Sequence, residues 1–242
     1  MHAGAADRRR VLVLTGVLLP VLLAWNNLLV HRLPGRPGSY VVANVAAAGV
    51  LLAAARAAGL SWAELGLDRR RLAPGARWGG GCAAAVAAGY AVALALPALR
   101  PLLADGRVAR LDAAELAGQA LVRIPLGTVL WEEVAFRGVL LAALARLLPR
   151  AGAVGVSAAV FGLWHVRPTL GALAANDLAG PPLARAGAVL LACLATAAAG
   201  VLFAALRERS GSLLAPALLH LATNSLGLLA AATAHRLGQP VP

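Results

Sequence analysis

A pair of adjacent carboxylates, Glu132 and Glu133, interrupts a long apolar stretch of the chain. Ionisable side chains at the centre of a membrane-spanning helix cost about 2.5–3.5 kcal/mol each, so two of them together need a reason. Arg137 follows Glu133 by four residues and shares its helical face, whereas Glu132 is turned about 100° away on an α-helix. We therefore expect Arg137 to neutralise Glu133 and Glu132 to remain free for chemistry.

Two histidines, His165 and His220, also lie in apolar stretches. Phe161 precedes His165 by four residues and Asn224 follows His220 by four, so each pair shares a helical face. A single histidine in a membrane helix more often makes an interhelical hydrogen bond than performs catalysis. Two of them together with a glutamate pair favour a catalytic site.

The composition indicates that membrane helices position these residues. The chain has 242 residues, of which 60% are hydrophobic and 13% charged, and its mean hydropathy is +0.77. An ordinary soluble domain is about 45–50% apolar with about a quarter of its residues charged. We predict an all-α, polytopic transmembrane helix bundle that contacts membrane lipid and encloses an intramembrane polar cavity.

The basic charge is interpreted as a topology signal and not as a nucleic-acid-binding surface. The net charge is +12, and all 22 basic residues are arginines that lie between the apolar runs. Exclusive use of arginine indicates a GC-rich bacterial genome. With the N-terminus in the cytoplasm, eleven arginines lie on the cytoplasmic side and eight on the other. This bias favours a multi-pass protein of a bacterial cell membrane with a cytoplasmic N-terminus.

About seven spans are expected, because a bilayer core needs about 20 apolar residues per helix. They are predicted at residues 11–30, 40–60, 78–96, 124–147, 152–165, 186–206 and 213–234. Residues 1–242 would form one membrane-embedded domain, and the motif-bearing catalytic core would occupy about 121–229. The connection 61–67 is predicted to be amphipathic and to lie at the membrane surface. The amides of Asn26, Asn27 and Asn44 are predicted to make interhelical hydrogen bonds.

Three short motifs follow one another on successive helices. They are EExxxR at 132–137, FxxxH at 161–165 and HxxxN at 220–224, and the segment RSGSLLAP at 209–216 leads into the third. This set resembles the CPBP family of intramembrane proteases, which includes the type II CAAX prenyl endopeptidases and the Abi bacteriocin-immunity-type proteins. The resemblance covers about 121–229, with a weaker similarity at 63–67.

The resemblance implies an intramembrane endopeptidase that hydrolyses a peptide bond of a membrane-associated protein or peptide. Glu132 would be the general base that activates water, and His165 would help to hold that water. His220 and Asn224 would stabilise the oxyanion of the tetrahedral intermediate. The supporting residues would be Glu133, Arg137 and Phe161.

Alternatives to this mechanism and function remain open. Glu132, His165 and His220 are also a possible ligand set for a divalent metal such as zinc, with a fourth position open for water. The sequence has no HExxH motif, and we favour the version without a cofactor. A non-catalytic bacteriocin-immunity-type protein would keep the fold, but every motif position is filled here. A proton-coupled transporter would be expected to show paired repeats, which the sequence lacks.

Overall fold

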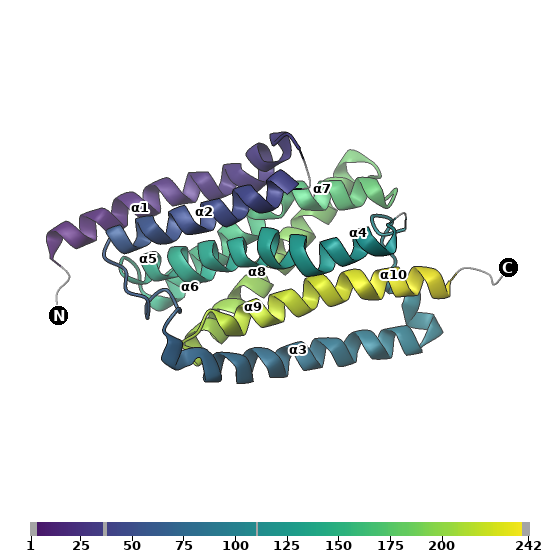
Figure 1. The fold of residues 1–242 in the computed structure, drawn as a ribbon. Coiled ribbons are helices and arrows are strands. Elements are labelled where there is room, and N and C mark those ends of the chain that lie inside the picture. The colour runs from purple at the N-terminus through teal and green to yellow at the C-terminus, as the bar shows by residue number, and fades with distance from the viewer. Residues whose placement is uncertain (1–3, 36–37, 110, 239–242) are drawn as a thin grey trace.

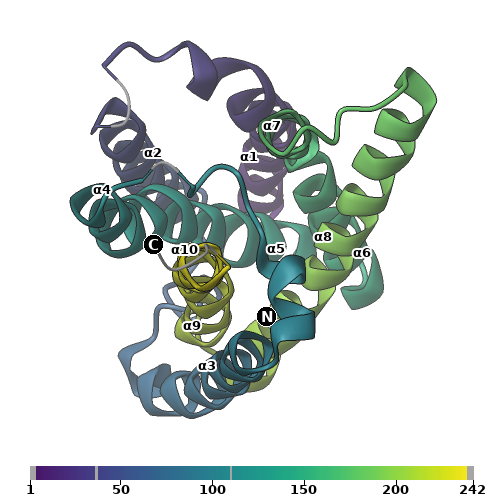
Figure 2. The same ribbon diagram turned by 90° about the vertical axis from the view of Figure 1, so that its right-hand side faces the viewer.

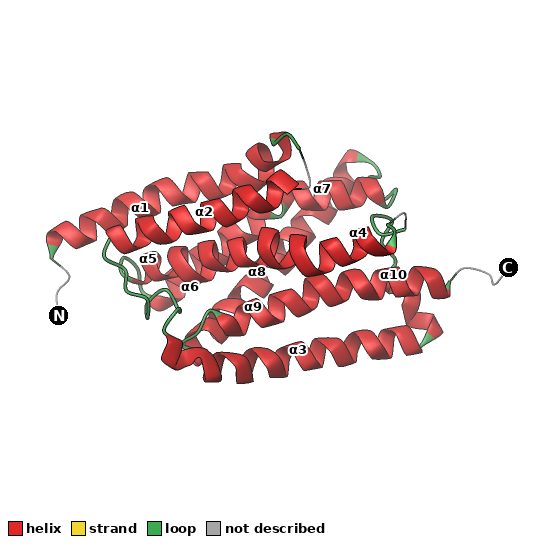
Figure 3. Ribbon diagram, viewed as in Figure 1, coloured by secondary structure: helices red, strands yellow, loops and turns green. Residues whose placement is uncertain are grey.

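The computed structural model describes residues 4–35, 38–109 and 111–238, and within these ranges it contains helices and no strands (Figures 1 and 3). The predicted all-α class is therefore confirmed. The α-helices are α1 (Ala5–Ala24), α2 (Gly38–Ala57), α3 (Leu72–Ala95), α4 (Ala113–Gly118), α5 (Leu141–Ala145), α6 (Arg150–Trp164), α7 (Val166–Ala175), α8 (Pro182–Ser210), α9 (Leu214–Leu221) and α10 (Gly227–Leu237). Short 3-10 segments lie at Val30–Arg32, Arg69–Arg71 and Pro97–Leu103.

Several helical turns have π geometry, in which the backbone bonds reach one residue further than in an α-helix. They occupy Trp25–Leu29 after α1, Gln119–Leu130 and Glu133–Leu140 between α4 and α5, and Ala222–Leu226 between α9 and α10. Such turns occur frequently at functional sites. Here they contain the motif residues Glu133, Arg137 and Asn224 and several side chains of the cavity described below.

The helix that carries both glutamates runs through the middle of the bundle. It is continuous from α4 to α5 and lies between the α1–α2 pair and the α9–α10 rod (Figure 2). A capping box starts it, because the Asp112 side chain accepts a hydrogen bond from the Glu115 backbone N–H and the Glu115 side chain accepts one from the Asp112 N–H. Every residue from 131 to 144 is buried. The glutamates therefore lie in the protein interior and do not face lipid.

Five helices are long and apolar enough to cross a membrane by their length and composition. They are Ala6–Arg32, Gly38–Ala57, Arg69–Ala95, Pro182–Ser210 and Leu214–Leu237, and they match five of the seven predicted spans. The predicted span 124–147 lies in the central helix, whose charged residues keep it out of this set. The predicted span 152–165 corresponds to α6, which has only 15 residues. Five of the seven predicted spans are thus matched by candidate helices, and the count of seven stays a prediction.

The connection 61–67, predicted to be amphipathic, has a buried and an exposed side, since Leu65 is buried and Trp62 is 49% exposed. Leu60 and Leu65 have no exposed surface, so this segment is inserted into the end of the bundle. Arg146 at the end of α5 pairs with Glu64, and Arg207 of α8 donates hydrogen bonds to the carbonyls of Ala63 and Glu64. The buried leucines and the two arginines together fix the connection to the bundle, which an amphipathic pattern alone does not reveal.

Glycines let α3 and α6 approach their neighbours closely. A Cβ atom at Gly79 would lie 2.7 Å from the carbonyl oxygen of Ala215 on α9. One at Gly162 would lie 2.5 Å from the carbonyl oxygen of Cys193 on α8. Small residues at helix contacts allow such close packing in membrane proteins. The second contact is one turn from His165 and therefore helps to place the FxxxH motif.

Candidate active site

The Glu132 carboxylate lies at the centre of the candidate site and is 4% exposed. Its Oε1 accepts a hydrogen bond of 2.9 Å from the indole N–H of Trp164. Its Oε2 is buried without a hydrogen-bond partner among the described residues. Buried polar atoms are normally bonded, so an unpaired carboxylate oxygen marks a place where water or a ligand group can bind.

Glu133 forms the predicted ion pair with Arg137. Arg137 Nη1 lies 3.2 Å from Glu133 Oε1, and both side chains are at most 2% exposed. The same Oε1 atom also receives a bond from His220, whose Nδ1 lies 2.8 Å away. Because a carboxylate only accepts, Nδ1 carries the proton in this bond. Glu133 thus fixes both an arginine on its own helix and a histidine on α9.

An aromatic cage surrounds the Arg137 guanidinium. Its central carbon lies 3.9 Å from the ring centroid of Phe161, 4.6 Å from that of Phe203 and 5.8 Å from that of Phe136. Cation–π attraction is strongest where water is excluded, as it is here. Phe161, the predicted supporting residue of the FxxxH motif, therefore contacts the charge-balancing arginine directly.

His165 lies at a break between two helices. α6 ends at Trp164, α7 begins at Val166, and His165 has φ −91° and ψ 3°. Its Nδ1 lies 2.7 Å from the carbonyl oxygen of Phe161. A carbonyl can only accept, so Nδ1 is the donor and Nε2 of the neutral ring is left to accept a proton or a hydrogen bond.

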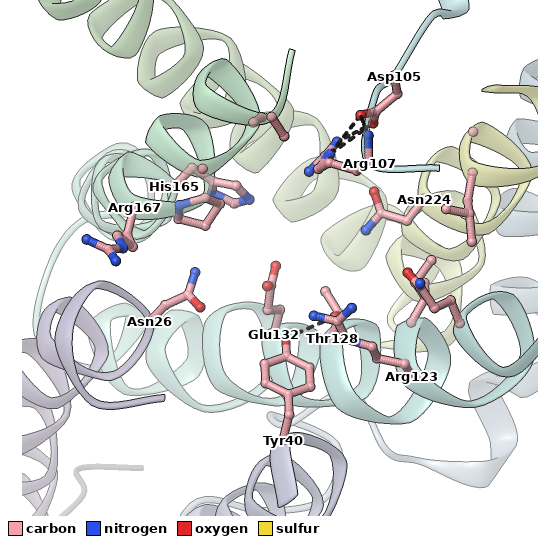
Figure 4. Close-up of a pocket in the computed structure, with 18 of the residues that line it drawn as sticks. Asn26, Tyr40, Asp105, Arg107, Arg123, Thr128, Glu132, His165, Arg167 and Asn224 are labelled. Atoms are coloured by element: carbon pink, nitrogen blue, oxygen red, sulfur yellow. Dashed lines mark hydrogen bonds and ion pairs between the residues drawn. The ribbon is translucent and has the colours of Figure 1, made fainter. Parts of the chain in front are cut away.

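A cavity of about 850 Å³ brings most of the predicted catalytic residues together. Glu132, His165 and Asn224 all line it, and Figure 4 shows them facing one another across it. The fourth predicted residue, His220, is not among its lining residues. His220 is instead buried beside Glu132, with Nε2 3.8 Å from Glu132 Oε2. The geometry thus separates three cavity-facing groups from one buried partner.

Asn224 is half-buried in a π-helical turn, and its amide has no hydrogen-bond partner in the described part of the chain. An unpaired amide on a cavity wall can donate to a ligand oxygen. His220 is one turn earlier on the same helix and packs against the ring of Phe203, with centroids 5.2 Å apart. The HxxxN motif therefore supplies one group to the cavity and one to the buried cluster.

A polar bridge that sequence reasoning missed lies at the wall of the cavity, where Asp105 and Arg107 are among the lining residues. Arg107 binds Asp105 through two nitrogens, and Asn176 at the end of α7 accepts a hydrogen bond from the Gly106 N–H. The hydrogen bonds from Arg107 lower the pKa of Asp105, although partial burial opposes this effect. The bridge joins the loop before α4 to α7. It could not be found in the sequence because its residues are about 70 positions apart and belong to no motif.

Two aromatic residues of the site were also missed or left without a role. Trp164, which precedes His165, binds Glu132 directly, and Phe203 of α8 contacts both Arg137 and His220. The position of Trp164 next to the motif residue His165 could have indicated that its side chain lies in the site. For Phe203 no such signal exists, because α8 carries none of the three motifs.

A metal ion does not fit the predicted ligand set in this conformation. Among residues 4–35, 38–109 and 111–238, no three His, Cys, Asp or Glu side chains are arranged to hold a metal ion. His220 Nδ1 is bonded to Glu133, so only Nε2 could serve as a ligand. We therefore derive no catalytic step through a metal.

Comparison with known proteins agrees with the three motifs. Residues 116–226 match the model of the Rce1-like family, described as type II CAAX prenyl endopeptidase Rce1-like. This match confirms the resemblance that the three motifs indicate, and it implies a membrane protease. A search of curated proteins and a search of solved structures gave no match. The matched segment contains Glu132, His165, His220 and Asn224 and leaves out α1, α2 and α3.

Proposed function

We propose that this protein is an intramembrane glutamic endopeptidase that cleaves a membrane-associated protein or peptide in the cavity beside Glu132. The observation that carries the proposal is the convergence of Glu132, His165 and Asn224 on one cavity, with His220 next to the same carboxylate. The family match supports the protease class. We further propose that the cavity lies within a bacterial cell membrane and that the N-terminus is cytoplasmic.

In the first step, Glu132 acts as general base. A water molecule held between Glu132 and His165 Nε2 attacks the carbonyl carbon of the scissile bond, and its proton passes to the Glu132 carboxylate. The unpaired Oε2 of Glu132 and the free Nε2 of His165 support these positions.

In the second step, the tetrahedral intermediate collapses. Asn224 donates a hydrogen bond to the oxyanion, as preorganised donors do in water-poor sites. The C–N bond breaks, and the proton held by Glu132 passes to the leaving amine. His220 can donate to the oxyanion only through Nε2 and only when both ring nitrogens carry a proton, because Glu133 holds the Nδ1 proton.

The test uses purified protein in lipid vesicles with two probes, a farnesylated CAAX-type peptide and the same peptide without the lipid. Wild type is expected to cleave at least one of them, and Glu132→Gln should lower the rate roughly 10²–10⁴-fold by removing the base. Glu115→Gln, at an exposed position on the same helix, is the matched control. Cleavage by Glu132→Gln at the wild-type rate would overturn the assignment.

Because the family name describes a prenyl endopeptidase, comparative proteomics extends the search for substrates. Membrane and secreted fractions of a deletion strain are compared with those of strains that express wild type or Glu132→Gln. A polypeptide that is shortened only with wild type is a substrate. If the deletion and wild-type fractions are identical and neither probe is cut, a non-catalytic immunity-type role replaces the protease.

A metal-dependent version of the same protease makes a different prediction. Treatment with a divalent-metal chelator should leave the cleavage rate of the proposed glutamic protease unchanged. Loss of the activity and its return on addition of zinc would establish the metal version.

A further inference from the structure

The helix break at His165 leaves backbone groups that need partners. The last carbonyls of a helix and the first N–H groups of the next one cannot bond within their own helices. At this break the Trp164 carbonyl and the Arg167 N–H belong to these groups, and the Leu163 carbonyl, which accepts from the His165 N–H at the helix end, has a second lone pair to share. Buried backbone groups of this kind are nearly always satisfied by another part of the protein.

Two consecutive asparagines in the π-helical turn after α1 make hydrogen bonds to these backbone groups. Asn26 Nδ2 donates to the Trp164 carbonyl at 3.0 Å, and Asn27 Nδ2 donates to the Leu163 carbonyl at 3.1 Å. Asn27 Oδ1 accepts from the Arg167 N–H at 3.0 Å. The three bonds secure both sides of the break, and His165 lies between them.

The same turn also reaches the helix that carries Glu132. Trp25 Nε1 donates to Asn44 Oδ1 at 2.8 Å, and Asn44 Nδ2 donates to the Gly127 carbonyl at 2.6 Å. Asn44 is 1% exposed, so this connection is shielded from solvent. The rings of Trp25 and Trp131 are 5.7 Å apart, and Trp131 immediately precedes Glu132.

We propose that Trp25, Asn26, Asn27 and Asn44 are positioning residues that hold His165 and Glu132 at the separation needed to share one water molecule. This inference rests on the proposed function, since it assigns a role in that catalytic step. Polar side chains in an apolar helix are costly unless they are hydrogen-bonded, and all three amides are bonded to backbone of the motif segments or to Trp25. These residues lie outside the matched family segment, so the N-terminal helices complete the site.

Asn27 provides the clearest test because its side chain, unlike that of Asn26, does not line the cavity. Asn27→Leu removes all of its bonds to the break while suiting a half-buried position in a membrane helix. Asn27→Asp keeps the acceptor for the Arg167 N–H but loses the donor to Leu163. Thr15→Val is the control, because Thr15 is buried in the same helix and bonds only to the Val11 carbonyl within it.

The first measurement is the cleavage kinetics of whichever peptide probe wild type cuts. Asn27→Leu should lower kcat about 10²-fold, the scale of a 1 Å misplacement, with KM within about twofold of wild type. Asn27→Asp should be intermediate and Thr15→Val unchanged. In a His165→Ala background, Asn27→Leu should cause no further loss, since it acts through His165. A full additional loss in that background would show a general structural effect and overturn the proposal.

The second measurement needs no activity. Amide hydrogen exchange over residues 162–169 should be faster in Asn27→Leu than in wild type or Thr15→Val, because the Arg167 N–H loses its acceptor. Equal exchange in all three proteins would overturn the proposal. If wild type cuts neither probe and the proteomic comparison finds no substrate, the proposed function fails, and the exchange experiment still decides whether the asparagines hold the break.

Discussion

At the scale of single residues, the buried Glu133 side chain binds two other buried side chains, those of Arg137 and His220. Its Oε1 binds Arg137 Nη1 and His220 Nδ1, and Arg137 is enclosed by the rings of Phe161 and Phe203. Removing one partner of a buried ion pair leaves the other charge without compensation in a region of low dielectric constant. The structural role predicted for Glu133 therefore differs from that of its neighbour Glu132.

Glu133→Gln should destabilise the protein by roughly 3–5 kcal/mol, because it leaves the buried Arg137 guanidinium without its counter-charge. The measurement is the thermal unfolding midpoint in detergent. Glu132→Gln is the control and should unfold near the wild-type temperature, since the new amide oxygen can still accept the Trp164 hydrogen bond. Wild-type stability in Glu133→Gln together with lost activity would reassign Glu133 to catalysis.

At the scale of elements, the connection 61–67 depends on a glycine. Gly66 has φ +77°, in the region that favours glycine, and a Cβ there would lie 2.1 Å from Arg207 Nε. The Gly66 carbonyl also accepts the Leu213 N–H at 2.8 Å, which ties the connection to the start of α9. The position of α9 in turn sets the position of the HxxxN motif.

Gly66→Ala should therefore lower the unfolding temperature and also reduce activity, because α9 and His220 shift with the connection. Gly80→Ala is the matched control, since no atom lies within 4 Å of its added Cβ. On helix α3 this change should stabilise the protein by about 0.5–1 kcal/mol. Unfolding midpoints and cleavage rates of both variants provide the test. A Gly66→Ala protein as stable and active as wild type would contradict the importance of this contact.

The pairing of Glu64 with Arg146 gives the same connection a pH dependence. Burial raises the Glu64 pKa, but hydrogen bonds from Arg146 and Ser61 outweigh this effect and hold the pKa at about 2, below the usual glutamate value of 4.5. A lowered folded-state pKa contributes stability above pH 4.5 that is lost as the pH falls toward 2. Because Glu64 is partly exposed, we expect at most about 1 kcal/mol.

In Glu64→Gln, the unfolding midpoint measured between pH 6 and pH 3 should fall less steeply with acidification than in wild type. The Glu64 side chain contributes stability that is lost between its usual pKa of 4.5 and its lowered pKa of about 2. Most of the difference between the two proteins should therefore appear below about pH 4.5. If the unfolding midpoints of the two proteins fall equally between pH 6 and pH 3, the ion pair contributes nothing to stability.

At the scale of the whole molecule, the cavity opens toward the end of the bundle opposite the N-terminus. Its lining includes Asp105 and Arg107 in the connection before α4 and Arg167 in the first turn of α7. The start of α1 lies at the other end, with the connection 58–71 (Figure 1). If the end that holds the start of α1 and the arginine run 69–71 is cytoplasmic, the cavity opens toward the outer side of the membrane.

Cysteine labelling in intact bacterial cells tests this orientation. In a background of Cys82→Ala and Cys193→Ala, Leu178→Cys near the mouth should react with a membrane-impermeant maleimide. Trp62→Cys at the other end should react only after permeabilisation. Leu178 is 65% and Trp62 49% exposed, so both sites are accessible to the reagent. The reverse labelling pattern would place the cavity mouth in the cytoplasm.

The sequence by itself determined the helical class, five of the candidate spans and the ion pair of Glu133 with Arg137. These features follow from composition and from the local geometry of a helix, in which residues four apart are neighbours. The three motifs were sufficient to indicate the family, because their residue types and order along the chain are read without any fold. The other two predicted spans, 124–147 and 152–165, stay predictions, since buried charges and a short helix keep them outside a criterion of length and composition.

Only the tertiary structure decided which groups meet. His220 binds Glu133 across 87 positions, Trp164 binds Glu132 across 32, and Asn26 binds the Trp164 carbonyl across 138. Such contacts depend on how helices cross and on where π-helical turns rotate a side chain, and no local pattern encodes either. The exclusion of His220 from the cavity and the support that α1 gives to His165 are consequences of packing, which is why a helix with no catalytic motif can still hold the site in place.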